Sequence, residues 1–86
     1  MMNQLWVSDP LSAKIHYWFQ NGNAYNYGGS VNVGSGADAM TFSKDGNTCY
    51  VTNQDENSVS VVDVVGFKEV MKVSVGEKPG GSNYQV

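Results

Sequence analysis

Short segments in which apolar and polar residues alternate follow one another along the chain, with turn residues between them. This alternation is typical of β-strands, whose successive side chains point to opposite faces of a sheet. From Leu5 onward, no window keeps the apolar spacing of an amphipathic helix without a Gly or Asn break. We therefore expect an all-β, antiparallel fold, with strands over residues 5–9, 14–20, 24–33, 38–43, 48–53, 58–64 and 69–75.

Turn residues mark where these strands end. Pro10 closes the first strand, because proline lacks the N–H that a sheet requires and fixes φ. The strongest hairpin signal is Lys-Asp-Gly-Asn at residues 44–47, since Asp-Gly accepts the positive φ of a tight turn. Gly28 and Gly29 are expected to weaken or bulge the third strand. Loops or linkers are expected over residues 34–37, 54–57 and 76–81.

The chain also repeats itself. Residues 6–9 (Trp-Val-Ser-Asp) match residues 50–53 (Tyr-Val-Thr-Asn), an offset of 44 (50 minus 6). Residues 31–34 match residues 73–76 at an offset of 42 (73 minus 31), which predicts a two-residue insertion between Asn23 and Ser30. A period of about 40 to 45 residues that holds four short strands is the signature of a β-propeller blade.

The motif Tyr50-Val51-Thr52-Asn53 and its surroundings resemble the YVTN β-propeller repeat family. The resemblance is strong over residues 33–79, about one repeat, and weaker over residues 5–32, which depart from it in an aromatic run and in the Gly28-Gly29 pair. It implies four-stranded antiparallel blades, which normally stand in a ring of roughly six to eight around a channel. For a full-length parent it also implies a periplasmic or extracellular location.

The repeat divides the chain into a partial first blade at residues 1–36, a complete repeat at 37–78 and the start of a third at 79–86, where Ala37 aligns with Pro79 and Phe42 with Tyr84. About two blades leave open edges and faces, which invite further pairing. We expect a fragment of a larger propeller, with a protomer that completes a ring by self-assembly as the other interpretation.

Length, charge and composition limit the classes of partner that we expect this chain to bind. A chain of 86 residues forms one small domain with a thin core. Its net charge is −3 and its five basic residues are all lysines, so we expect no nucleic-acid partner. The first ten residues contain no basic residue and no long apolar run, so we expect no export signal or membrane span in this chain. The compartment is left open.

Two motifs with known chemistry fit poorly. Residues 34–39 match the dinucleotide fingerprint G-x-G-x-x-A, but the helix that would hold the pyrophosphate is not predicted after them, so we favour a linker. Asn53, Asp55 and Asn57 alternate like the start of a calcium loop. That loop also needs Gly at its sixth and Glu at its twelfth position, which here are Ser58 and Val64, so the site fails.

Catalytic and metal-binding residues are not evident. Cys49 and His16 are the only cysteine and histidine, whereas a closed zinc site needs four such ligands. We interpret Cys49 as a buried, inert thiol and His16 as an ordinary imidazole. Asp38 and Asp63 lie near strand ends, but nothing in the sequence pairs them as acid and base. We therefore expect no catalytic residue, no metal and no cofactor.

The aromatic residues suggest packing between blades more than ligand binding, since large rings suit either role. A candidate interaction surface consists of Trp6, Tyr17, Trp18, Tyr25, Tyr27, Asp55 and Glu56. The expected function is a non-enzymatic propeller module that acts as a binding or protein-interaction scaffold. Its expected partners are further blades of a parent protein, or other copies through edge strands. The alternative is a piece of a propeller enzyme or haem- or redox-associated protein whose site needs further blades.

Overall fold

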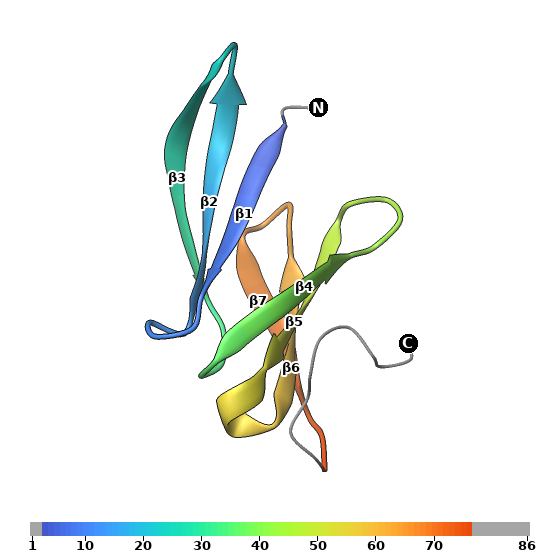
Figure 1. Cartoon of the computed structure of the whole chain (residues 1–86). Helices are drawn as coiled ribbons and strands as arrows, with labels where there is room; N and C mark the ends of the chain where they lie inside the picture. Colours follow the sequence, from blue (N-terminus) through green and yellow to red (C-terminus); the bar gives the residue numbers. More distant parts are fainter. Residues whose placement is uncertain (1–2, 77–86) are drawn as a thin grey trace.

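The computed structural model describes residues 3–76, which fold into two antiparallel sheets (Figure 1). The first sheet has the order β1-β2-β3: β1 (Gln4–Asp9), β2 (Lys14–Asn21) and β3 (Ala24–Asn32). The second has the order β4-β5-β6-β7: β4 (Ala37–Phe42), β5 (Thr48–Asn53), β6 (Ser58–Asp63) and β7 (Lys68–Ser74). The all-β, antiparallel prediction is confirmed, and each strand end lies within one residue of its predicted position.

The internal repeat is visible in the strand pairing. Trp6 pairs with Tyr17 across β1 and β2, and 44 residues later Tyr50 pairs with Val61 across β5 and β6. A bulge follows Tyr17 in the first sheet, and one follows Val61 in the second. The turns agree as well, because Ala13 and its counterpart Asn57 both have a φ of 55°. The two sheets are therefore copies of one blade-like unit.

The two extra residues of the first copy lie at the tip of the β2–β3 hairpin, which overlaps the predicted stretch between Asn23 and Ser30. Phe19 pairs with Asn26, and its counterpart Asp63 pairs with Lys68, so the first hairpin is two residues longer at its tip. Gly28 and Gly29 are aligned with Val70 and Met71 at the shared bulge, so the insertion does not include this glycine pair. The bulge itself was predicted. A side-chain carbon at Gly28 would lie 2.5 Å from the Phe19 ring, which explains why glycine is needed there.

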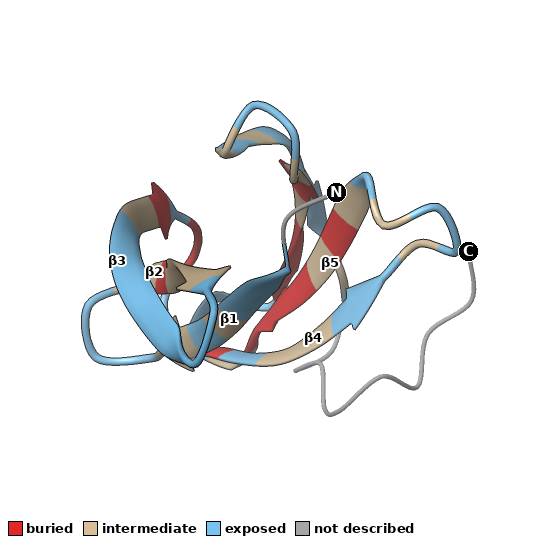
Figure 2. Ribbon diagram, turned by 90° about the horizontal axis from the view of Figure 1, so that it is seen from above, coloured by how far each residue is buried: buried red, intermediate tan, exposed pale blue. Residues whose placement is uncertain are grey.

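The hydrophobic core lies between the sheets, where β1 contacts β4 and β3 contacts β7 (Figure 2). Its buried members come from both sheets: Ile15, Val31, Val33, Ala37, Cys49, Val51 and Val62. Cys49 is fully buried, and burial raises the pKa of its thiol to about 12. The predicted burial of Cys49 is confirmed. Because only the thiolate is a strong nucleophile, the raised pKa accords with the interpretation of Cys49 as an inert thiol.

Local turn chemistry follows the sequence. In the Asp-Gly turn Gly46 has a φ of 77°, and its N–H donates to the Ser43 carbonyl. The Asp45 carboxylate accepts hydrogen bonds from the Ser43 hydroxyl and the Asn47 N–H. The predicted loop after β5 contains a 3-10 turn, Gln54–Glu56. Within residues 3–76 no helix is long enough to cross a membrane. The expected third repeat, at residues 79–86, lies outside the described part of the chain.

Candidate functional site

The structure distributes the seven predicted surface residues over three places. Trp6 and Tyr17 lie between the sheets, half-buried against the core. A second group faces away from the second sheet: Trp18, Tyr25 and Tyr27. Asp55 and Glu56 lie in the 3-10 turn after β5. The seven predicted surface residues therefore lie in three different environments.

Aromatic rings fill the space between the two sheets. The Tyr17 ring stacks on Phe67 with 4.3 Å between centroids, and Trp6 stacks on Tyr17 at 5.6 Å. Phe42 of β4 meets Trp6 edge-on at 5.7 Å. Phe67 has a φ of 56°, a conformation that costs a side-chain-bearing residue roughly 1 kcal/mol or more. This stack holds the β6–β7 hairpin against the first sheet.

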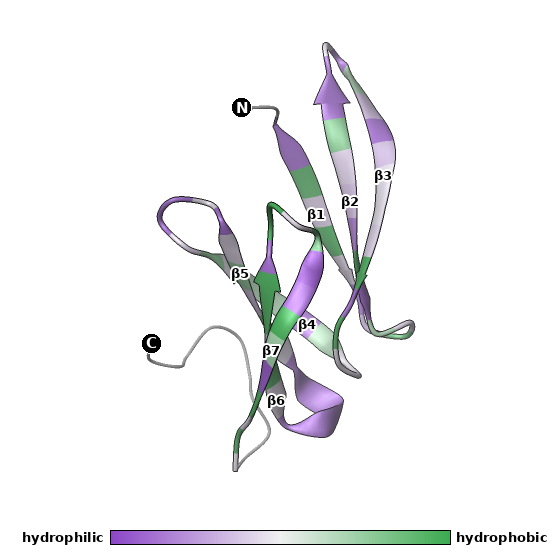
Figure 3. Cartoon of the chain, turned by 180° about the vertical axis from the view of Figure 1, so that it is seen from behind, coloured by the Kyte–Doolittle hydropathy of each residue, from purple (hydrophilic) through white to green (hydrophobic). Residues whose placement is uncertain are grey.

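The opposite side of the first sheet exposes apolar and aromatic side chains among polar ones. We call it the outer face of the first sheet. Its apolar and aromatic members are Leu5, Val7, Trp18, Tyr25 and Tyr27, and its polar members are Asp9, Lys14, His16, Gln20, Ser30 and Asn32. Leu5 is 45% exposed, Val7 42% and Tyr27 57%. Figure 3 shows hydrophobic segments along β1, the strand that contains Leu5 and Val7.

His16 is held in the middle of that face by two partners. Its Nε2 lies 3.1 Å from the Asp9 carboxylate and its Nδ1 lies 2.8 Å from the Tyr27 hydroxyl. The bond with His16 and the Ser12 contacts lower the pKa of Asp9 below its ordinary value. Both ring nitrogens of His16 are therefore hydrogen-bonded to side chains of the same face.

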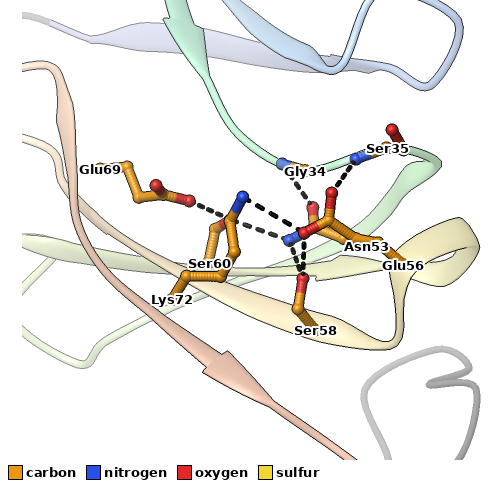
Figure 4. Close-up of polar contacts among 8 residues, drawn as sticks. All are labelled: Gly34, Ser35, Asn53, Glu56, Ser58, Ser60, Glu69 and Lys72. Carbon is orange, nitrogen blue, oxygen red and sulfur yellow. Dashed lines mark hydrogen bonds and ion pairs between the residues drawn. The ribbon is translucent and has the colours of Figure 1, made fainter.

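A polar network centred on Asn53 ties the linker between the sheets to the second sheet (Figure 4). The buried Asn53 side chain accepts from the Gly34 N–H at 3.1 Å. Its Nδ2 donates to the Ser58 hydroxyl at 3.0 Å and to the Ser60 hydroxyl at 2.8 Å. Ser60 in turn donates to the Glu69 carboxylate. In the described residues no buried side-chain nitrogen or oxygen lacks a partner, so this network is complete without a ligand.

Glu56 extends the network to the protein surface. Its carboxylate accepts hydrogen bonds from the Ser35 N–H and the Ser58 hydroxyl, each at 2.8 Å, and lies 3.2 Å from the Lys72 ammonium. The Ser35 N–H is the main cause that lowers the pKa of Glu56 below its ordinary value, followed by Ser58 and then Lys72. The neighbouring Asp55 donates its N–H to the Ser35 carbonyl at 3.1 Å. Both residues therefore anchor the linker.

The surface hollows are shallow and offer no reactive pair. One of about 320 Å³ lies where β1 meets β4, lined in part by Trp6, Phe42 and Val64. Another of about 350 Å³ lies between β3 and β7, beside Lys68 and Glu69. Among residues 3–76 no three His, Cys, Asp or Glu side chains converge as metal ligands. The Asp38 carboxylate instead accepts from Gln54, and Asp63 accepts from the Val65 N–H.

Two residues that matter in this geometry were not singled out by sequence reasoning. Phe67 gave no signal, because a single aromatic residue after a glycine reads as part of a turn. Asn53 was visible at the end of its motif, but it was weighed as a calcium ligand. Its position at a strand end, five residues before Ser58 and seven before Ser60, is the signal that would have found the network.

The comparisons agree with this arrangement at the level of the fold. No protein-family model matches the sequence, and a search of curated proteins found no relative. Among solved structures, the chain is similar to Kuenenia stuttgartiensis hydrazine synthase, with a TM-score of 0.67 and 26% identity over 88% of this chain. This chain spans 24% of the length of that protein chain. The all-β chain thus consists of two blade-like antiparallel sheets that resemble part of a larger protein.

Proposed function

We propose that this chain is a non-enzymatic β-propeller repeat module of the YVTN type that acts as a protein-interaction scaffold. The observation that carries the proposal is the outer face of the first sheet, where Leu5, Val7 and Tyr27 are exposed beside Trp18. Its counterpart on the second sheet, which includes Cys49, Val51 and Val62, is buried. A surface whose copy is a packed interface in the same molecule is suited to bind another protein.

The polar groups support the same proposal. Asn53, Ser58 and Ser60 bond one another and Gly34, and Glu56 bonds the linker. These bonds hold the two sheets in place, and general acid and base work would need two carboxyls or imidazoles that face a substrate. Within residues 3–76 the polar network therefore has a structural role, since it binds the linker to the second sheet.

A hydrophobic dye tests the scaffold role. In dilute, folded protein the dye 1-anilinonaphthalene-8-sulfonate should bind the outer face of the first sheet, and near-ultraviolet circular dichroism should confirm that the protein is native. The variant Leu5→Ser/Val7→Ser should lose most of the dye emission and keep the native spectrum. Leu11→Ser is the matched control, because Leu11 is 99% exposed in a turn away from this face. A native protein that binds no dye would contradict the proposal.

The match to hydrazine synthase favours a second candidate, since that protein is an enzyme by its name. In this candidate the chain is part of an enzyme or haem-associated propeller whose site needs further blades. Haem titration separates the two candidates. Because both His16 nitrogens are engaged, the scaffold role predicts no shift of the Soret band. A shift that is lost in His16→Ala would favour the second candidate.

A further inference from the structure

The interface between the two sheets joins one face of the first sheet to the opposite face of the second. Because the sheets are copies of one unit, each of these two faces has a counterpart on the other sheet that points away from the interface. The second sheet contributes the face that contains Cys49, Val51 and Val62. In the first sheet the same register places Leu5, Val7 and Trp18 at the corresponding positions, 44 residues earlier. This half of the interface is therefore buried in one sheet and uncovered in the other.

The other half of the interface is repeated in the same way. The first sheet contributes Trp6, Ile15 and Tyr17, which lie against the second sheet. Their counterparts and the β7 residues opposite them form the outer face of the second sheet: Tyr50, Val59, Val61, Met71 and Val73. Val59 is buried and Tyr50 and Val61 are half-buried, so the exposed apolar part of this face lies on β7. Met71 is 59% exposed on this face. Hydrophobic colouring along the middle of β7 is visible from behind (Figure 3).

We propose that copies of this chain associate head to tail, with the outer face of the second sheet of one copy on the outer face of the first sheet of the next. This inference rests on the proposed scaffold role and names its partner. The contact joins two different faces, so it is heterologous and continues from copy to copy until a ring closes. With two blade-like sheets per chain, three or four copies would give a ring of roughly six to eight blades.

The repeated register gives the reason why the occupant is a second copy. On the outer face of its second sheet, a second copy presents the counterparts of Trp6, Ile15 and Tyr17, the residues with which the first sheet covers the second within one chain. Within residues 3–76 β1 pairs only with β2, so its other edge leaves N–H and C=O groups open to pairing beside this contact.

Sedimentation velocity over a range of protein concentrations tests the contact. The wild-type chain should shift from monomer to a species of three or four copies as concentration rises. Val7→Asp and Met71→Asp place a charge on the outer face of the first and the second sheet, respectively, at positions that are exposed in the monomer. Each should weaken association by about 30-fold or more, the usual effect of a change at the centre of an interface. Leu11→Asp is the control and should associate like wild type.

Mixing the two variants tests the head-to-tail geometry. The Val7→Asp chain keeps an unchanged outer face on its second sheet. The Met71→Asp chain keeps an unchanged outer face on its first sheet. An equal mixture should therefore form a one-to-one dimer and nothing larger, although each variant alone stays monomeric. A mixture that stays monomeric, or a single variant that associates like wild type, would overturn the proposal. So would a wild-type chain that is monomeric at every concentration, and in that case dye binding still decides the scaffold role separately.

Discussion

The two sheets solve the same local problem with different side chains. At the end of the second sheet's β5, Asn53 is fully buried and donates to Ser60 at 2.8 Å. At the corresponding position of the first sheet, Asp9 is partly exposed and lies 3.1 Å from His16, the counterpart of Ser60. Both pairs connect the ends of neighbouring strands. One is a neutral pair in the core, and the other is an ionisable pair at the surface.

The difference shows that burial selects the chemistry. The buried Asn53 amide is neutral and donates to two hydroxyls, which pass their own hydrogen bonds outward to the Glu56 and Glu69 carboxylates. A buried unpaired carboxylate in its place would lose several kcal/mol of hydration. Asp9 keeps access to water, so a charge is tolerated there at little cost. The same backbone unit thus accepts either a neutral or an ionisable hydrogen-bonded pair, provided that the ionisable pair is exposed to water.

Exchanging the side-chain types at Asn53 and Asp9 should break this comparison most strongly. In Asn53→Asp a carboxylate replaces the Nδ2 donor, so the Ser58 and Ser60 oxygens face a buried charge near Glu56. The free energy of unfolding should fall by about 3 kcal/mol or more, measured by urea denaturation. Asp9→Asn is the matched control, and its urea midpoint should stay close to that of wild type. Equal losses in the two variants would contradict the role given to burial.

Burial should also decide how much an aromatic ring contributes to stability on the inner and on the outer face of the first sheet. Phe67→Ala removes the ring that stacks on Tyr17 at 4.3 Å, and unfolding should become easier by about 2 kcal/mol. Tyr27→Ala removes an aromatic ring from the exposed outer face, where less than about 1 kcal/mol should be lost in the dilute monomer. The loss of stability of the two variants is compared by thermal unfolding at low protein concentration. Similar losses would show that the outer face is already packed.

Much of this fold was predictable because each strand carries its own signal. Alternating apolar residues gave strands within one residue of their ends, and Asp45-Gly46 gave the turn. The repeat of Trp6 to Asp9 at Tyr50 to Asn53 gave the relation between the sheets, which the paired register confirms. These signals are local or periodic, so a single sequence contains them.

The candidate site was less predictable because it depends on which face of its sheet each side chain lies on. Trp6 and Trp18 look alike in the sequence, yet one lies in the inter-sheet stack and the other on the outer face. The positive φ of Phe67 depends on stacking with Tyr17, a residue far away in the sequence. Local propensity favours glycine at such a position, and a tertiary contact overrides it.

The hairpin glycines should give a smaller effect that is similar in both sheets. Gly22 and Gly46 have φ values of 62° and 77°, and no atom lies within 4 Å of where a side-chain carbon would stand. Replacing either with alanine should therefore cost only the conformational strain, about 1 kcal/mol in chemical denaturation. Gly28→Ala is the contrasting variant, because the added carbon would lie 2.5 Å from the Phe19 ring. A loss at Gly28 no larger than at Gly46 would argue against the close packing of the bulge.

The smallest expected effect is an acid-dependent loss of stability that comes from Glu56. The pKa of this carboxyl is lowered in the folded chain by the Ser35 N–H, Ser58 and Lys72, from an ordinary value of 4.5. A lowered folded pKa means that the stabilisation is present above the ordinary value and is lost as pH falls through the folded pKa. In Glu56→Gln the urea midpoint should therefore vary less between about pH 6 and about pH 3 than in wild type. Asp45→Asn provides the comparison outside the linker, since the pKa of Asp45 is also lowered, by the Asn47 N–H and the Ser43 hydroxyl. If Glu56 anchors the linker, Glu56→Gln but not Asp45→Asn should also speed hydrogen exchange at the Ser35 N–H, and equal exchange in the two variants would contradict that anchoring role.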